Sequence, residues 1–266
     1  MTSSAQADEY RSHNGPLAGT FDWRSWPLSG KRVAAASCML AFAFALWAQG
    51  GPSRAVAALV VVETALLCLP WRLPRIHRSG RSFWVETLCG LVAPGGALIV
   101  LVVAQRNLLT QLADWWWFVA AAGVGGVFWL VSGLDIRAVP SGMLAFLMGP
   151  TPRSQGRARA VCAAAGPFGE EALFRSVVLT TASAAATPMG LLSAVAFVAR
   201  HHVSPGSNGR GTTRATLTEI AAAVLLLVLT VLSQSLFPAL LAHLINNLPG
   251  VIIELQREDT GKLDAS

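Results

Sequence analysis

The sequence has few charged residues. Asp, Glu, Lys and Arg make up 13% of its 266 residues, whereas soluble domains usually contain about 25%. A water-soluble protein of this size would have too few charges to cover its surface. The composition, which is 53% hydrophobic, also excludes a disordered chain, a collagen and a disulfide scaffold. What is left is a polytopic membrane protein, whose spans need about 20 mostly apolar residues each.

Cysteine is also scarce. Cys38, Cys68, Cys89 and Cys162 lie in or beside apolar runs and form no CxxC pair. They are interpreted as small buried residues without a redox or metal-binding role. A secretory signal is not expected either, because the first apolar run starts at Val33 and more spans follow it.

Eight apolar segments are candidate membrane spans. Their approximate bounds are 33–50, 55–70, 85–105, 115–133, 167–185, 188–203, 216–233 and 236–253. The stretch 142–150 is too short to cross and is expected to lie at the interface or fold back. We therefore predict an all-α, polytopic integral membrane protein with about eight transmembrane helices.

The basic residues alternate between the gaps. Seventeen Lys and Arg residues fall in the tails and in alternate gaps, against two in the other gaps. The positive-inside rule then places both termini, 1–32 and 257–266, in the cytoplasm. The formal net charge of +6 is explained by these topology signals, so the bilayer is an expected partner and nucleic acid is not.

Ionisable residues inside spans are costly and are functional candidates by default. The last four segments hold most of them, and the candidates there are Glu170, Glu171, Arg175, His201, His202 and His243. Among the earlier segments Glu63 lies deepest, and we expect it to have a packing or polar-bridging role rather than a catalytic one.

The first cluster is the stretch Gly166–Arg175. Pro167 predicts a helix start, which would place Glu170 and Glu171 in the first turn, where the helix dipole favours negative charge. Glu171 and Arg175 are spaced i,i+4 and should form an ion pair. Glu170 lies about 100° away around the helix, so it should lack that partner and be available. A buried structural ion-pair cluster explains the same spacing.

Two more pairs have i,i+4 spacing. Phe197 and His201 share one helix face, while His202 points elsewhere; a purely interfacial histidine is the alternative. His243 and Asn247 form two converging polar donors, which suit an anionic oxygen. They also suit an interhelical hydrogen-bond pair worth about 0.6–2 kcal/mol. Pro249–Gly250 should break the helix just beyond this pair.

Together, these residues could face one cavity on the cytoplasmic side, where a Glu and a His activate water and a His and an Asn hold an oxyanion. They also carry a family resemblance. EExxxR, FxxxH and HxxxN, in this order, resemble the three motifs of the CAAX protease and bacteriocin-processing (CPBP) family, which includes type II CAAX prenyl endopeptidases and bacterial immunity-type proteins. The resemblance covers roughly 160–250, and the motif residues are Glu170, Glu171, Arg175, Phe197, His201, His243 and Asn247.

The resemblance implies an intramembrane glutamic endopeptidase without a metal or other cofactor. Glu170 would activate water with the help of His201, and His243 and Asn247 would form the oxyanion site. The implied supporting residues are Glu171, Arg175 and Phe197. The catalytic bundle would be made by the last four helices, within 160–256, after an N-terminal set of helices and basic loops over 33–159. The substrate would be a peptide or membrane protein reaching the site from the cytoplasmic leaflet.

Other interpretations stay open. A zinc site could use the same Glu and two His, but there is no HExxH and the two His are 42 residues apart, so the metal-free hypothesis is favoured. A non-catalytic immunity or scaffold protein could keep the motifs for stability, and a transporter could use Glu170 and Arg175. His202, next to His201, leaves the choice of ring open. The composition, rich in Ala, Gly and Arg, is typical of a bacterial protein and predicts a bacterial cell membrane.

Overall fold

The computed structural model describes residues 30–68, 81–132, 135, 137–149, 151–203 and 213–257. Within these ranges the secondary structure is helical and no strand is present. The predicted tails 1–32 and 257–266 lie outside the described residues except for 30–32 and 257. Residues 69–80 and 204–212, which belong to two of the basic gaps, also lie outside the described residues.

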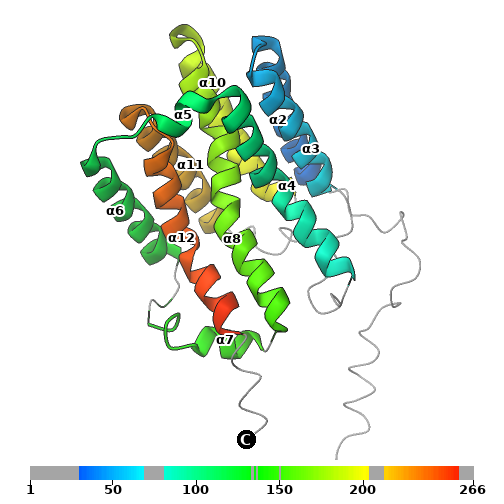
Figure 1. Cartoon of the computed structure of the whole chain (residues 1–266), viewed down its shortest axis with the longest axis vertical. Coiled ribbons are helices and arrows are strands. Elements are labelled where there is room, and N and C mark those ends of the chain that lie inside the picture. Colours follow the sequence, from blue (N-terminus) through cyan, green and yellow to red (C-terminus); the bar gives the residue numbers. More distant parts are fainter. Residues whose placement is uncertain are drawn as a thin grey trace, which may run out of the picture.

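The described helices keep the labels of Figure 1. They are α2 (Gly30–Gln49), α3 (Ser53–Cys68), α4 (Arg81–Ala104), α5 (Arg106–Thr110), α6 (Trp115–Ser132), α7 (Met143–Met148), α8 (Arg153–Phe174), α9 (Ser176–Thr180), α10 (Ser183–Val203), α11 (Thr213–Ser233) and α12 (Phe237–Gln256). By length and composition, four candidate membrane spans lie in the described ranges, in α2, α4, α11 and α12, and α6 contains a shorter apolar stretch. The prediction of an all-α membrane protein is confirmed.

Two of the expected helix boundaries are wrong. The segment 167–185 is not one helix, because α8 begins at Arg153 and ends at Phe174, before the short α9. Pro167 is therefore inside α8, and Glu170 and Glu171 lie near its C-terminal end instead of in its first turn. At this end the dipole favours a cation, and Arg175 is the residue that caps the helix.

Pro249 does not break its helix either. α12 continues through it to Gln256. Prolines are tolerated inside membrane helices when neighbouring groups replace the lost hydrogen bonds. The six-residue α7, by contrast, is too short to cross a bilayer, as predicted for 142–150.

Helix α8 runs through the middle of the molecule (Figure 1), packed against α4 and α12. α12 also packs against α6, and α10 packs against α2, which in turn packs against α3. Two glycines allow close backbone approach. A Cβ on Gly169 would lie 2.8 Å from the backbone nitrogen of Pro94, and a Cβ on Gly125 would lie 2.7 Å from the oxygen of Ala242. Small residues at such crossings are typical of membrane helix packing.

The distribution of polarity is that of a protein in lipid. Large apolar side chains are exposed on the outward helix faces, including Phe44, Ile99, Val103 and Leu130. Several charged side chains are instead buried between the helices. Because burying a charge is expensive unless it is paired, the partners of these side chains define the candidate site.

Candidate active site

Glu171 is the centre of one buried network. Its Oε1 lies 2.8 Å from His243 Nδ1, and its Oε2 lies 3.4 Å from Arg175 Nε. The i,i+4 ion pair predicted from the sequence is therefore present. Arg175 is 0% exposed, donates from Nη2 to the oxygen of Ala223 at 3.3 Å, and lies over the Phe197 ring at 4.7 Å. The network fixes the end of α8 against α10, α11 and α12.

Glu170 belongs to a second network. Its Oε1 accepts a hydrogen bond of 2.8 Å from Arg200 Nη1. Arg175 pairs with Glu171, as predicted, but the expectation that Glu170 is left available is wrong for Oε1, which Arg200 binds. Its Oε2 lies 3.8 Å from His201 Nε2 and 3.9 Å from His243 Nε2. This oxygen is buried and accepts no hydrogen bond from the residues that the structure describes.

Arg200 also binds Glu63 on α3. Its Nη2 and Nε donate to Glu63 Oε1 at 2.7 and 3.0 Å. Of the two roles expected for Glu63, packing or polar bridging, this contact is a polar bridge between α3 and α10. Sequence reasoning missed Arg200 because an arginine near the end of an apolar segment looks like a topology signal. Its position next to His201 is the only sequence signal that pointed to the site.

The ring of His201 has a defined tautomer. Nδ1 lies 2.9 Å from the carbonyl oxygen of Phe197, which can only accept, so Nδ1 carries the hydrogen. In the neutral ring Nε2 is then an acceptor directed at Glu170. The Phe197 ring packs against both imidazoles, with centroids 5.0 Å from His201 and 6.0 Å from His243. The expected packing of Phe197 beside His201 is therefore present.

His202 lies outside this arrangement. Its Nε2 is 2.9 Å from Glu219 Oε2 on α11. Of the two adjacent histidines, His201 is thus the one whose ring faces Glu170. Glu219 was not among the expected site residues, although a carboxylate inside a predicted span is a sufficient signal.

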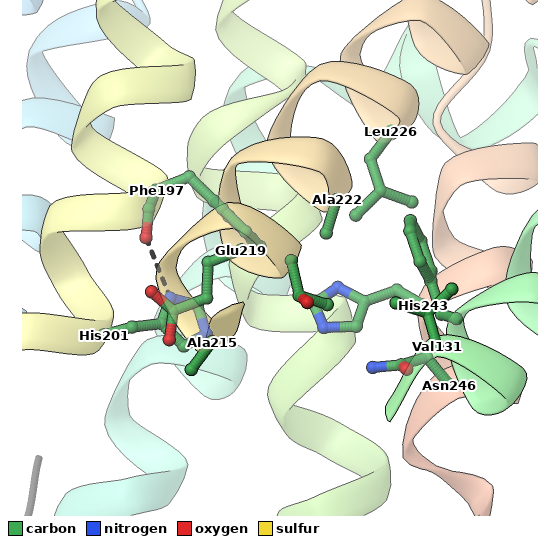
Figure 2. Close-up of a pocket in the computed structure, with 11 residues that line it drawn as sticks. Val131, Phe197, His201, Ala215, Glu219, Ala222, Leu226, His243 and Asn246 are labelled. Atoms are coloured by element: carbon green, nitrogen blue, oxygen red, sulfur yellow. Dashed lines mark hydrogen bonds between the residues drawn. The ribbon is translucent and has the colours of Figure 1, made fainter. Parts of the chain in front are cut away.

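A pocket of about 460 Å³ opens beside the two imidazoles, with polar and apolar walls (Figure 2). Its polar lining includes His201, His243, Glu219 and Asn246, and its apolar lining includes Phe128 and Leu226. His243 reaches from α12 toward the middle of the pocket, and the Asn246 amide is turned the same way (Figure 2). Such a cleft, with a few polar groups in an apolar wall, is typical of a small-molecule or peptide site.

Asn247 is placed differently. Its Nδ2 donates to the backbone oxygen of Ala163 on α8 at 3.2 Å, and its Oδ1 accepts from Asn246 Nδ2 at 3.3 Å. Among the described residues that line the pocket, α12 contributes His243 and Asn246 but not Asn247. The structure therefore brings together Glu170, His201 and His243 and places Asn247 between α12 and α8.

A zinc site was the alternative expected for the same Glu and His side chains. The described residues contain no group of three His, Cys, Asp or Glu side chains placed so that it could hold a metal ion. The four cysteines, all of which the structure describes, are half-buried and form no disulfide with one another.

Residues 158–249 match the family model described as type II CAAX prenyl endopeptidase Rce1-like. Over these residues the chain is similar to that family. The match confirms the resemblance to the CPBP family, and all seven motif residues lie inside it, from Glu170 to Asn247. Glu63, which binds Arg200 of the matched segment, lies outside that segment. No curated protein and no solved structure matches the chain.

Proposed function

We propose that the protein is an intramembrane, metal-independent glutamic endopeptidase that hydrolyses a peptide bond of a membrane-associated peptide or protein. The observation that carries the proposal is the buried Oε2 of Glu170, which faces the Nε2 atoms of His201 and His243 at 3.8 and 3.9 Å. The family of the segment 158–249 supports the reaction class.

The spacing suits activation of a water molecule. Distances of 3.8 and 3.9 Å are too long for direct hydrogen bonds but fit one bridging water oxygen. The water donates one hydrogen to Glu170 Oε2 and the other to the unprotonated Nε2 of His201. Arg200 binds only Oε1 of Glu170, so Oε2 is left to take the proton.

Hydrolysis then follows general acid–base logic. Glu170 accepts a proton from the water as its oxygen attacks the carbonyl carbon of the substrate. The oxyanion that forms is stabilised by Nε2–H of His243, in its doubly protonated form, and by an asparagine amide of α12. The resemblance implies Asn247 for the second donor. When the C–N bond breaks, Glu170 returns the proton to the leaving amine, and Glu171 balances the charge of the His243 ring through Nδ1.

The substrate enters the pocket beside α6 and α11. The apolar wall contributed by Phe128 and Leu226 suits an apolar side chain next to the scissile bond. We also propose a bacterial cell membrane location with cytoplasmic termini. With Arg200 assigned to the site, sixteen of the seventeen basic residues still mark one side, against two on the other.

The test is Glu170→Gln, which keeps the shape of the side chain and removes the base. Membrane proteomes of cells that express the wild type or Glu170→Gln identify cleaved products, and a quenched fluorescent peptide spanning a cleavage site then measures the rate. We expect a loss of about 10²–10⁴-fold. Glu254→Gln is the matched control, because Glu254 pairs with Arg257 at the end of α12, away from the pocket.

Two outcomes would overturn the proposal. A Glu170→Gln variant that cleaves at the wild-type rate would favour a scaffold or immunity protein. Loss of activity on chelation that stoichiometric zinc reverses would establish a metalloprotease in its place.

A further inference from the structure

Pro167 leaves one carbonyl of α8 without its usual donor. In an α-helix the N–H of residue i donates to the carbonyl of residue i−4. Proline has no N–H, so Pro167 cannot donate to the oxygen of Ala163. α8 nevertheless continues as a helix from Arg153 to Phe174 and carries Glu170 one turn after the proline. In a membrane helix such a carbonyl is normally satisfied by a neighbouring group.

Asn247 is that neighbouring group. Its Nδ2 donates to the Ala163 oxygen at 3.2 Å, across the contact between α12 and α8. Its Oδ1 accepts from Asn246 Nδ2 at 3.3 Å. Both ends of the Asn247 amide are thus engaged by the protein.

Asn246 has the surroundings of a residue that meets substrate. It lines the pocket together with His243, three residues earlier on the same helix. Its side chain is half-buried, and its amide is turned toward the pocket like the His243 ring (Figure 2). An amide nitrogen has two hydrogens, and the bond to Asn247 uses only one of them.

We propose that the two adjacent asparagines have different roles, whereas the motif resemblance implies a role for Asn247 alone. Asn247 is a positioning residue: it supplies the hydrogen bond that Pro167 cannot make and so fixes the helix carrying Glu170 against the helix carrying His243. Asn246 presents its amide to the carbonyl oxygen of the substrate. The assignment of Asn246 rests on the proposed endopeptidase function, whereas that of Asn247 does not.

A double-variant cycle tests the positioning role. Pro167→Ala restores a backbone N–H that can donate to Ala163, so the Asn247 amide should become dispensable for stability. We expect Asn247→Ala to lower the unfolding midpoint of the full chain in detergent by about 3–6 °C in the wild-type background. In the Pro167→Ala background the decrease should be less than half as large. An equal decrease in both backgrounds would overturn the positioning role.

Cleavage of a quenched fluorescent peptide tests the role of Asn246. Asn246→Ala should lower kcat by about 10²-fold, and kcat should fall equally in the Pro167→Ala background. The unfolding midpoint should decrease less than in Asn247→Ala, because only the bond to Asn247 Oδ1 is lost. If Asn246→Ala cleaves like the wild type, or if Asn247→Ala still loses about 10²-fold in the Pro167→Ala background, Asn247 is the substrate-binding amide and the division of roles is wrong. If the wild type cleaves nothing, the proposed function fails, while the cycle of unfolding midpoints still decides the role of Asn247.

Discussion

Replacing Arg200 tests whether α3 completes the candidate active site. Arg200 binds two buried carboxylates, Glu63 and Glu170, whose side chains are 5% and 10% exposed. Arg200→Met keeps the length of the side chain and removes the cation, which leaves both carboxylates without it. Removing one partner of a buried ion pair costs about 3–5 kcal/mol, mainly because the remaining charge is uncompensated. We expect a decrease of this size in the free energy of unfolding.

Glu63→Gln should cost less, about 1–3 kcal/mol, because Arg200 keeps Glu170 as its counter-ion. In the double variant Glu63→Gln/Arg200→Met, only Glu170 is left as a buried carboxylate without Arg200. Its cost should therefore be smaller than the sum of the two single costs by about 1–3 kcal/mol. The assay is denaturant unfolding in detergent, followed by the fluorescence of the nine tryptophans.

Arg54→Met is the matched control on α3. Arg54 is exposed and lies over the Trp47 ring at 5.6 Å, so its loss should cost no more than about 1 kcal/mol. The loss of unfolding free energy in the double variant could instead equal the sum of the two single losses within about 0.5 kcal/mol. The two residues would then not be coupled, and the reasoning would be refuted.

Two further predictions concern helix packing. Ser193→Ala should lower the unfolding free energy by about 1–3 kcal/mol, because the fully buried Ser193 hydroxyl donates to the oxygen of Phe174 at the end of α8; an unchanged midpoint in denaturant titration would contradict this. Gly125→Ala should destabilise by about 1–3 kcal/mol, since its Cβ would lie 2.7 Å from the oxygen of Ala242. Gly126→Ala, whose Cβ would meet nothing within 4 Å, should be neutral or stabilising, and equal effects of the two would rule out the close helix contact.

Much of the molecule could be predicted because the decisive signals are local. Charge depletion and apolar runs predict a helical membrane protein, and i,i+4 spacing places Glu171 beside Arg175 and Phe197 beside His201. These statements need only the geometry of one helix. Both contacts are present in the structure.

The remaining features depend on partners far away in the sequence. Arg200 lies 137 residues from Glu63 and 30 from Glu170, and no local pattern tells which way an arginine near a span end will turn. The local sequence around Pro167 predicts a helix start. The helix continues through it because Asn247, 84 residues away, supplies the hydrogen bond to the Ala163 oxygen. A local rule for proline fails wherever a distant side chain replaces the missing hydrogen bond.

The contact between Arg200 and Glu63 has a consequence for modularity. The segment 158–249 that matches the family does not contain α3 or the α2 that covers α10. Cut out on its own, that segment would expose the α10 face that α2 covers and leave Arg200 with only one of its two carboxylates. The segment that matches the family is therefore not a self-contained unit that could be moved into another chain. A chimera that contains the segment 158–249 would also need a helix pair like α2 and α3, with an acidic side chain at the position of Glu63.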